Sequence, residues 1–337
     1  MNNSNFQNGF NPEGGACVYT PAPPPQYFEK RAVRKTGNKI GAALLFFFGV
    51  TLIISFSIGI GTAILGKADL VSDPFLTLAI NTVVSVMGFL GGGLLLIKIT
   101  NERSRISFAA PEKGTLVPLI LIGVGFCYAA NIAVSIMQAS LSFLGELKGG
   151  DFETPRGLFG FIFTVISVAV FPALLEEFFF RGALLGSLLK FGKPFAIFTS
   201  AVLFGLIHGN LVQIPFAFLV GLVLGFAVVE SGSIWTGIII HFINNFLSVC
   251  FKYLSELGLG DGINLIFNII ILGAIGFGFL GVRLLTLKKG RLFDFAKTPH
   301  HSTAKQRFWW LMGSPTVIVA TVFVLFEILL NQFSPAV

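Results

Sequence analysis

Residues 172 to 181 read Pro-Ala-Leu-Leu-Glu-Glu-Phe-Phe-Phe-Arg and place two adjacent carboxylates and an arginine inside a strongly apolar run. No Asp, Glu, Lys or Arg occurs between Gly157 and Leu175, and none follows Arg181 until Lys190. A charged side chain at the centre of a membrane helix costs about 2.5 to 3.5 kcal/mol on insertion scales. Three such groups together therefore need either mutual pairing or a chemical function where water is scarce.

The composition of the whole chain is that of a membrane protein. Of its 337 residues, 54% are hydrophobic and only 12% are charged, whereas a soluble domain has about 25% charged residues. Apolar stretches near the length of about 20 residues that a membrane helix needs recur along the chain. The sequence predicts an all-α, polytopic membrane helix bundle of about eight to nine transmembrane helices, with spans at about 40–65, 75–99, 115–143, 157–189, 194–210, 213–230, 233–252, 263–287 and 311–332.

Four regions follow from this pattern. We expect a disordered cytoplasmic tail at 1–38, a transmembrane bundle at 39–290, a basic cytoplasmic loop at 291–310 and an additional C-terminal transmembrane helix at 311–332. The fourth to seventh spans, at 157–252, carry most of the unusual polar residues.

The net charge of +7 gathers in alternate loops rather than on one face of a helix. This distribution argues against nucleic-acid binding. The positive-inside rule predicts an integral membrane protein, in a bacterial plasma membrane, with its N-terminus in the cytoplasm and the lipid bilayer as its surroundings.

The charged residues of the opening stretch differ in the partners that a helix offers them. Glu177 and Arg181 are four residues apart, so they can pair on one face. Glu176 is rotated by about 100° from Glu177 and needs a partner from another span. The alternative is a structural ion pair near the membrane surface.

Two further motifs carry imidazoles. Phe204 and His208 share a face at the end of the fifth span, and His241 and Asn245 share a face in the seventh, from which Asn244 should be turned away. The predicted boundaries put His208 near the outer end of its span and Glu176 in the cytoplasmic half. The two meet only if the fifth helix continues past Asn210.

Other polar residues within the spans have simpler interpretations. Glu327 stands alone in the last span and is expected to be interfacial or packing-related. A second group is expected to join helices by hydrogen bonds: Asn81, Asn131, Gln138 and Asn268.

Two carboxylates, two imidazoles and an amide on three spans are the groups that a hydrolytic centre requires. A carboxylate and a neutral imidazole can deprotonate water, and an amide or a second imidazole can donate to a developing oxyanion. Two other functions use the same residues: a non-proteolytic scaffold or immunity protein, and a proton or cation relay. Asn245 distinguishes a peptidase from a relay, because an oxyanion needs a donor there and a relay gains little from an amide.

The three motifs, in this order, resemble the CPBP family, which includes the CAAX prenyl proteases and the bacteriocin-processing or immunity (Abi) proteins. The matching residues are Glu176-Glu177-Phe-Phe-Phe-Arg181, Phe204-Gly-Leu-Ile-His208 and His241-Phe-Ile-Asn-Asn245, within about 160 to 250.

The resemblance implies an intramembrane glutamic endopeptidase without a cofactor. It implies that Glu176 and His208 activate water, that His241 and Asn245 stabilise the oxyanion, and that Glu177 and Arg181 support them, with Phe204 beside His208. The alternative is a zinc site of two histidines and one glutamate. The expected partner is a membrane-embedded or lipidated peptide or protein substrate, entering from the cytoplasmic side.

Overall fold

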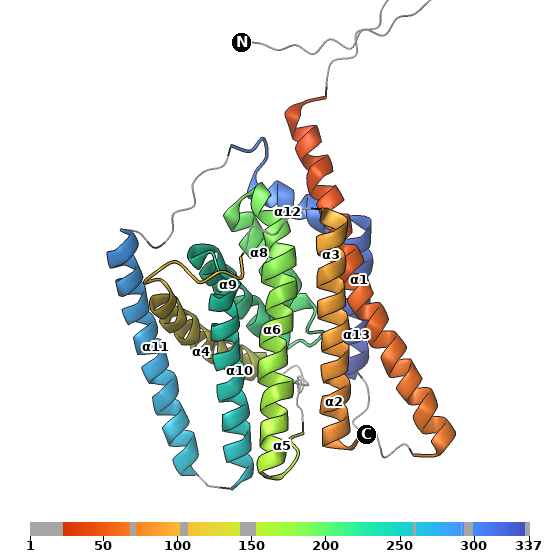
Figure 1. Cartoon of the computed structure of the whole chain (residues 1–337), viewed down its shortest axis with the longest axis vertical. Coiled ribbons are helices and arrows are strands. Elements are labelled where there is room, and N and C mark those ends of the chain that lie inside the picture. The colour runs from red at the N-terminus through yellow and green to blue at the C-terminus, as the bar shows by residue number, and fades with distance from the viewer. Residues whose placement is uncertain are drawn as a thin grey trace, which may run out of the picture.

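The computed structural model describes residues 23–67, 72–101, 107–141, 153–258, 261–290, 292 and 299–333. Within these residues every regular element is a helix, and the β contact between Ser107 and Ser233 is an isolated bridge. The predicted all-α class is confirmed. The helices run roughly alongside one another in a bundle (Figure 1).

The elements follow the chain in a simple order. The first are α1 (Pro25–Leu65), α2 (Pro74–Ser85) continued through the π-helical η2 (Val86–Leu90) into α3 (Gly91–Thr100), and α4 (Leu116–Leu141). One long helix then comprises six consecutive segments: α5 (Gly157–Thr164), η4 (Val165–Val170), α6 (Phe171–Glu177), η5 (Phe178–Leu185), α7 (Gly186–Leu188) and η6 (Leu189–Phe191). The last are α8 (Lys193–Leu206), α9 (Gln213–Ser231), α10 (Ile234–Glu256), α11 (Asp261–Lys289), α12 (Ala304–Met312) and α13 (Pro315–Phe333).

In the part of the chain that the structure describes, the number of helices that could span a membrane is seven to eight, against the eight to nine predicted. Among the described residues, seven helices are long and apolar enough, or eight if α12 and α13, which meet at 73°, form one broken span. The predicted fifth span is α8, which has 14 residues and a length of about 21 Å, short of the ~30 Å hydrocarbon core.

Helices α8 and α9 form a hairpin, and this arrangement determines where the site lies. The open ends of the hairpin meet the end of α11, since Lys193, Glu230 and Lys289 line one pocket. Its turn lies deep in the bundle, where Gly209 sits against Glu327, twelve residues into α13. We call the end of the bundle that carries the start of α1 and the open ends of this hairpin the N-terminal face (top of Figure 1).

The first helix begins earlier than predicted. Residues 25–38 were expected to be disordered but are helical from Pro25, whose fixed φ suits the first turn of a helix. Contacts with α12 stabilise this extension: Glu29 pairs with Arg307 at 3.2 Å, and Arg34 donates to the carbonyl of Gly313. Helix α12 itself begins inside the predicted basic loop. Residues 1–22 of the predicted tail lie outside the described residues.

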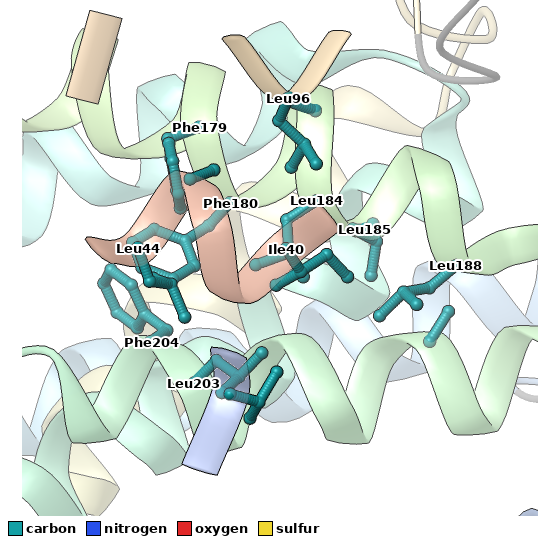
Figure 2. Close-up of a cluster of buried hydrophobic side chains, with 14 of the residues drawn as sticks. Ile40, Leu44, Leu96, Phe179, Phe180, Leu184, Leu185, Leu188, Leu203 and Phe204 are labelled. Carbon is teal, nitrogen blue, oxygen red and sulfur yellow. The ribbon is translucent and has the colours of Figure 1, made fainter. Parts of the chain in front are cut away.

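A cluster of buried apolar side chains joins η5 to α1, α3 and α8. Ile40, Leu44 and Leu96 pack around Phe179, Phe180 and Leu184 (Figure 2). On the α8 side, Phe180 meets Phe204 with ring centroids 5.0 Å apart. This packing fixes which face of α8 points toward η5. His208, four residues after Phe204, is thereby held on the same side.

Helices α4 and α11 approach closely through small residues. A Cβ at Gly125 would lie 2.7 Å from the carbonyl oxygen of Ala274 and 2.8 Å from the Cα of Gly278. Such contacts allow membrane helices to pack without large side chains between them. The pair forms the outer wall of the cavity described next.

Candidate active site

A cavity of about 620 Å³ lies between α4, η4 and α6, the α8–α9 hairpin, α10 and α11. Four predicted site residues line it together: Glu176, His208, His241 and Asn245. Phe204 borders it as well. Residues that are 69 positions apart in the sequence therefore share one wall, as the motif order suggested.

Glu177 and Arg181 lie behind this wall rather than in the cavity. Both side chains are fully buried, and Arg181 Nη1 donates to Glu177 Oε1 at 2.6 Å. The guanidinium also lies within 3.4 Å of the Gly221 carbonyl oxygen and 4.3 Å from the centroid of the Phe204 ring. The predicted i,i+4 pair is confirmed, and it connects α6 and η5 to both arms of the hairpin.

His241 joins the buried pair to the cavity. Its Nδ1 lies 3.0 Å from Glu177 Oε1, and its Nε2 lies 4.0 Å from Glu176 Oε2. A carboxylate paired with arginine can only accept, so Nδ1 carries the proton. Nε2 then faces Glu176, and a neutral ring has its lone pair there. Glu176 thus has a partner on another helix, as predicted.

His208 is held in a similar way from the opposite side. Its Nδ1 donates to the carbonyl of Phe204 at 2.7 Å, because a carbonyl oxygen only accepts. The Nε2 of a neutral His208 is therefore the basic nitrogen. The predicted position of this histidine near the outer end of a span is wrong. Helix α8 ends at Leu206, and Gly209 with φ of 59° makes the turn, so His208 lies inside the bundle without a longer helix.

Asn245 is oriented by a proline on the facing helix. Pro172 has no N–H, so the preceding turn, which is π-helical and includes the carbonyl of Val168, lacks one backbone donor. Asn245 Nδ2 donates to that carbonyl at 3.0 Å. This bond uses one of the two amide protons of Asn245.

Asn244 was predicted to turn away from the site, and this prediction is wrong. It lines the cavity, and its Nδ2 donates to Asn245 Oδ1 at 3.0 Å. Adjacent helical residues differ by only about 100° in direction, so a wide cavity can be bordered by both. The second amide therefore fixes the orientation of the first.

Gly237 belongs to the site although no sequence motif includes it. A Cβ at this position would lie 2.7 Å from Glu177 Oε2 and 2.6 Å from Val228 Cγ2, so only glycine leaves room for the carboxylate. A small residue four positions before His241, on the same helix face, was the available signal.

The zinc alternative requires two imidazoles and a carboxylate directed at a common point. Within the described part of the chain, no three His, Cys, Asp or Glu side chains are arranged to hold a metal ion. The Nδ1 atoms of both histidines are engaged by acceptors, which leaves each Nε2, a common zinc-binding nitrogen, on the other side of its ring, and His241 Nε2 is 4.0 Å from Glu176. The donor atoms of the zinc alternative are therefore present, and metal dependence is a matter for experiment.

Comparisons with known proteins agree with the motifs. The family model of type II CAAX prenyl endopeptidases, Rce1-like, matches residues 158–247, which include all seven predicted site residues. The chain is 28% identical over 197 residues to the membrane-embedded CAAX protease MroQ of Staphylococcus aureus (strain USA300), which covers 53% of this chain and 76% of that relative. No solved structure matches the chain. These matches and the three motifs support the CPBP family of CAAX-protease-like proteins, and together with the apolar helices they indicate an integral membrane protein.

Proposed function

We propose that the chain is an intramembrane endopeptidase in which Glu176 and His208 activate a water molecule. The observation that carries this proposal is that Glu176, His208, His241 and Asn245 line one cavity inside the bundle. The fixed environments of both histidines and of Asn245 support it, since a catalytic group must be held in position before the substrate arrives.

In the first step, water attacks the carbonyl carbon of the scissile peptide bond. Glu176 accepts one proton from this water, and the basic Nε2 of His208 orients it through a hydrogen bond. A tetrahedral intermediate with a negatively charged oxygen forms. The C–N bond then breaks, and the proton held by Glu176 passes to the leaving nitrogen, which gives a carboxylic acid and a free amine. The acid then loses its proton to the amine, which leaves a carboxylate and an ammonium group.

His241 and Asn245 are assigned to the developing oxyanion. The amide proton of Asn245 that does not bind Val168 is a suitable donor. His241 can donate from Nε2 only when its ring is protonated, and the carboxylate of Glu177 at Nδ1 stabilises that positive charge. Glu177 and Arg181 therefore act through His241 rather than on the substrate.

The substrate would be a membrane-embedded or lipidated peptide or protein. The basic residues near the N-terminal face, among them Lys30, Arg31, Lys190 and Lys193, support a cytoplasmic position for that face in a bacterial plasma membrane. Labelling of single cysteines introduced near Lys190 would test this orientation.

The function is tested by comparing new peptide termini in membranes of host cells that carry the native chain, Glu176→Gln, His208→Ala or Asn81→Leu. Asn81 is exposed on α2, away from the cavity, so its variant controls for insertion and expression. We expect termini that are lost in the first two variants and retained in the control. Identical termini in all four membranes, with each protein inserted, would exclude peptidase activity.

Metal independence needs a separate measurement. We expect purified native protein to keep its peptidase activity after treatment with a strong chelator and removal of free metal. Loss of activity that returns on addition of zinc, with no change in unfolding temperature, would instead support the zinc alternative.

A further inference from the structure

The cavity has a second wall, remote from the catalytic groups and rich in amides. Asn131 on α4 and Asn264 and Asn268 on α11 all line it. Asn264 and Asn268 are four residues apart and share a helix face. We call these three residues the amide wall. From the sequence, Asn131 and Asn268 are expected to form hydrogen bonds between helices.

The amide wall does not join helices in this structure. None of its three side chains makes a hydrogen bond to another described residue, and all three are exposed. Water in the cavity can satisfy such exposed amides. Three of them on one wall therefore keep donors and acceptors available to a molecule that displaces this water.

The remaining lining limits what that partner can be. Among the described residues that line the cavity there is no Lys or Arg, and Glu176 is the only acidic residue. The groups there that can become cationic are His208 and His241, which are assigned to the reacting atoms, so a free C-terminal carboxylate would find no separate cation to bind it on the described lining. The rest of the wall is largely aromatic and aliphatic, with Phe216, Phe251 and Phe267 as the largest apolar side chains.

The position of the cavity gives its direction. It receives residues of α10 only from His241 onward and residues 264–271 from the first turns of α11. At its other end, His208 and Gln213 from the hairpin line it. The amide wall therefore extends from the catalytic groups toward the opposite end of the bundle. With the N-terminal face in the cytoplasm, as proposed above, this direction differs from the predicted entry from the cytoplasmic side.

We propose that the amide wall binds the main chain of an extended, uncharged peptide segment, and that the bond cleaved lies inside a chain rather than beside its C-terminal carboxylate. This proposal rests on the proposed peptidase function. An extended segment in the membrane has N–H and C=O groups that need external partners. Amide side chains can satisfy both kinds, while the phenylalanines accept apolar side chains. A volume of about 620 Å³ lies in the range of roughly 300 to 1,000 Å³ typical of ligand pockets.

The test adds one variant, Asn264→Leu with Asn268→Leu, to the comparison of peptide termini. Leucine is similar in size and lacks hydrogen-bonding groups, and both positions are exposed, so folding should be preserved. Asn81→Leu is again the matched control. Synthetic peptides spanning an identified site, with the same core and either a free or an amidated C-terminus, are then hydrolysed by the purified native and double-variant proteins.

We expect termini that depend on Glu176 to fall inside chains, with uncharged residues on both sides. The double variant should raise KM by about five- to tenfold, the loss of one or two hydrogen bonds, with a smaller change in kcat. Amidated and free peptides should be cleaved at similar rates.

The two proposals fail in different ways. Absence of any terminus that depends on Glu176 would overturn the peptidase function and this inference with it. Termini that depend on Glu176 but need a nearby free carboxylate, lie among charged residues, or persist unchanged in the double variant would overturn this inference alone.

Discussion

The two neighbouring glutamates of α6 face opposite kinds of surroundings. Behind the cavity, Glu177 is fully buried and bound to Arg181 and His241, and apolar side chains surround this cluster. In front, Glu176 borders an open cavity whose amide wall has no partners among the described residues. On the first side the charges are paired within the protein, although Glu177 Oε2 and Arg181 Nε have no hydrogen-bond partner in the ranges that the structure describes, and the second side keeps hydrogen-bonding capacity for another molecule.

This difference separates positioning from chemistry. The buried pair of Glu177 and Arg181 connects the helix that carries it to α9 and α10, whereas the groups that would touch a substrate are left accessible. Variants on the buried side should therefore reduce stability first, and variants on the cavity side should reduce activity with the fold intact.

The largest effect is expected for Glu176→Gln. This change keeps the shape of the side chain but removes the base, so peptidase activity should fall by about 10²- to 10⁴-fold. The unfolding temperature of the purified protein in detergent should stay close to that of the native chain. Activity above a tenth of the native value would assign the base to another residue.

Arg181→Met should act mainly on stability. It leaves the buried carboxylate of Glu177 without its cation, and breaking such a pair costs about 3 to 5 kcal/mol. Unfolding monitored in detergent measures the loss. The double variant Glu177→Leu with Arg181→Met removes both charges and should regain much of the stability, although not activity, because His241 loses its partner. A single variant as stable as the native protein would contradict this role of the ion pair.

Gly237→Ala tests whether the two sides are mechanically connected. The new methyl group would meet Glu177 Oε2 and displace the carboxylate that orients His241. We expect activity to fall by about ten- to a hundredfold through misplacement of His241. The matched control is Gly276→Ala on α11, where the added methyl group would have nothing within 4 Å. Equal activity of both variants would mean that the position of Glu177 does not matter.

The smallest effect is expected for Pro172→Ala. The restored N–H competes with Asn245 for the carbonyl of Val168, so Asn245 should become less ordered. Activity should fall by about three- to fivefold, the equivalent of one hydrogen bond, while the helix becomes no less stable. An unchanged kcat and KM would show that Pro172 does not orient the site.

Much of this arrangement could be predicted from the sequence, and the parts that could not depend on spatial packing. The apolar spans, the Glu177–Arg181 pair and the shared cavity of the three motifs follow from helical periodicity. The depth of His208 does not, because it depends on where α8 ends relative to other helices. The role of Gly237 and the contact between Asn245 and Val168 involve residues that are distant in the chain. Asn264 has no motif, and only the packing of α11 on α4 brings it to the cavity.

The hairpin of α8 and α9 has a consequence for how the topology can be mapped. Because both of its ends return to the same face, it contributes an even number of crossings, whether it is counted as none or as two. Every later loop, and the chain end after α13, keeps the same side under either count. A reporter fused to the C-terminus therefore gives the same answer in both cases, and only a label placed in the turn between Leu206 and Gln213 can reveal that the chain reverses inside the bundle.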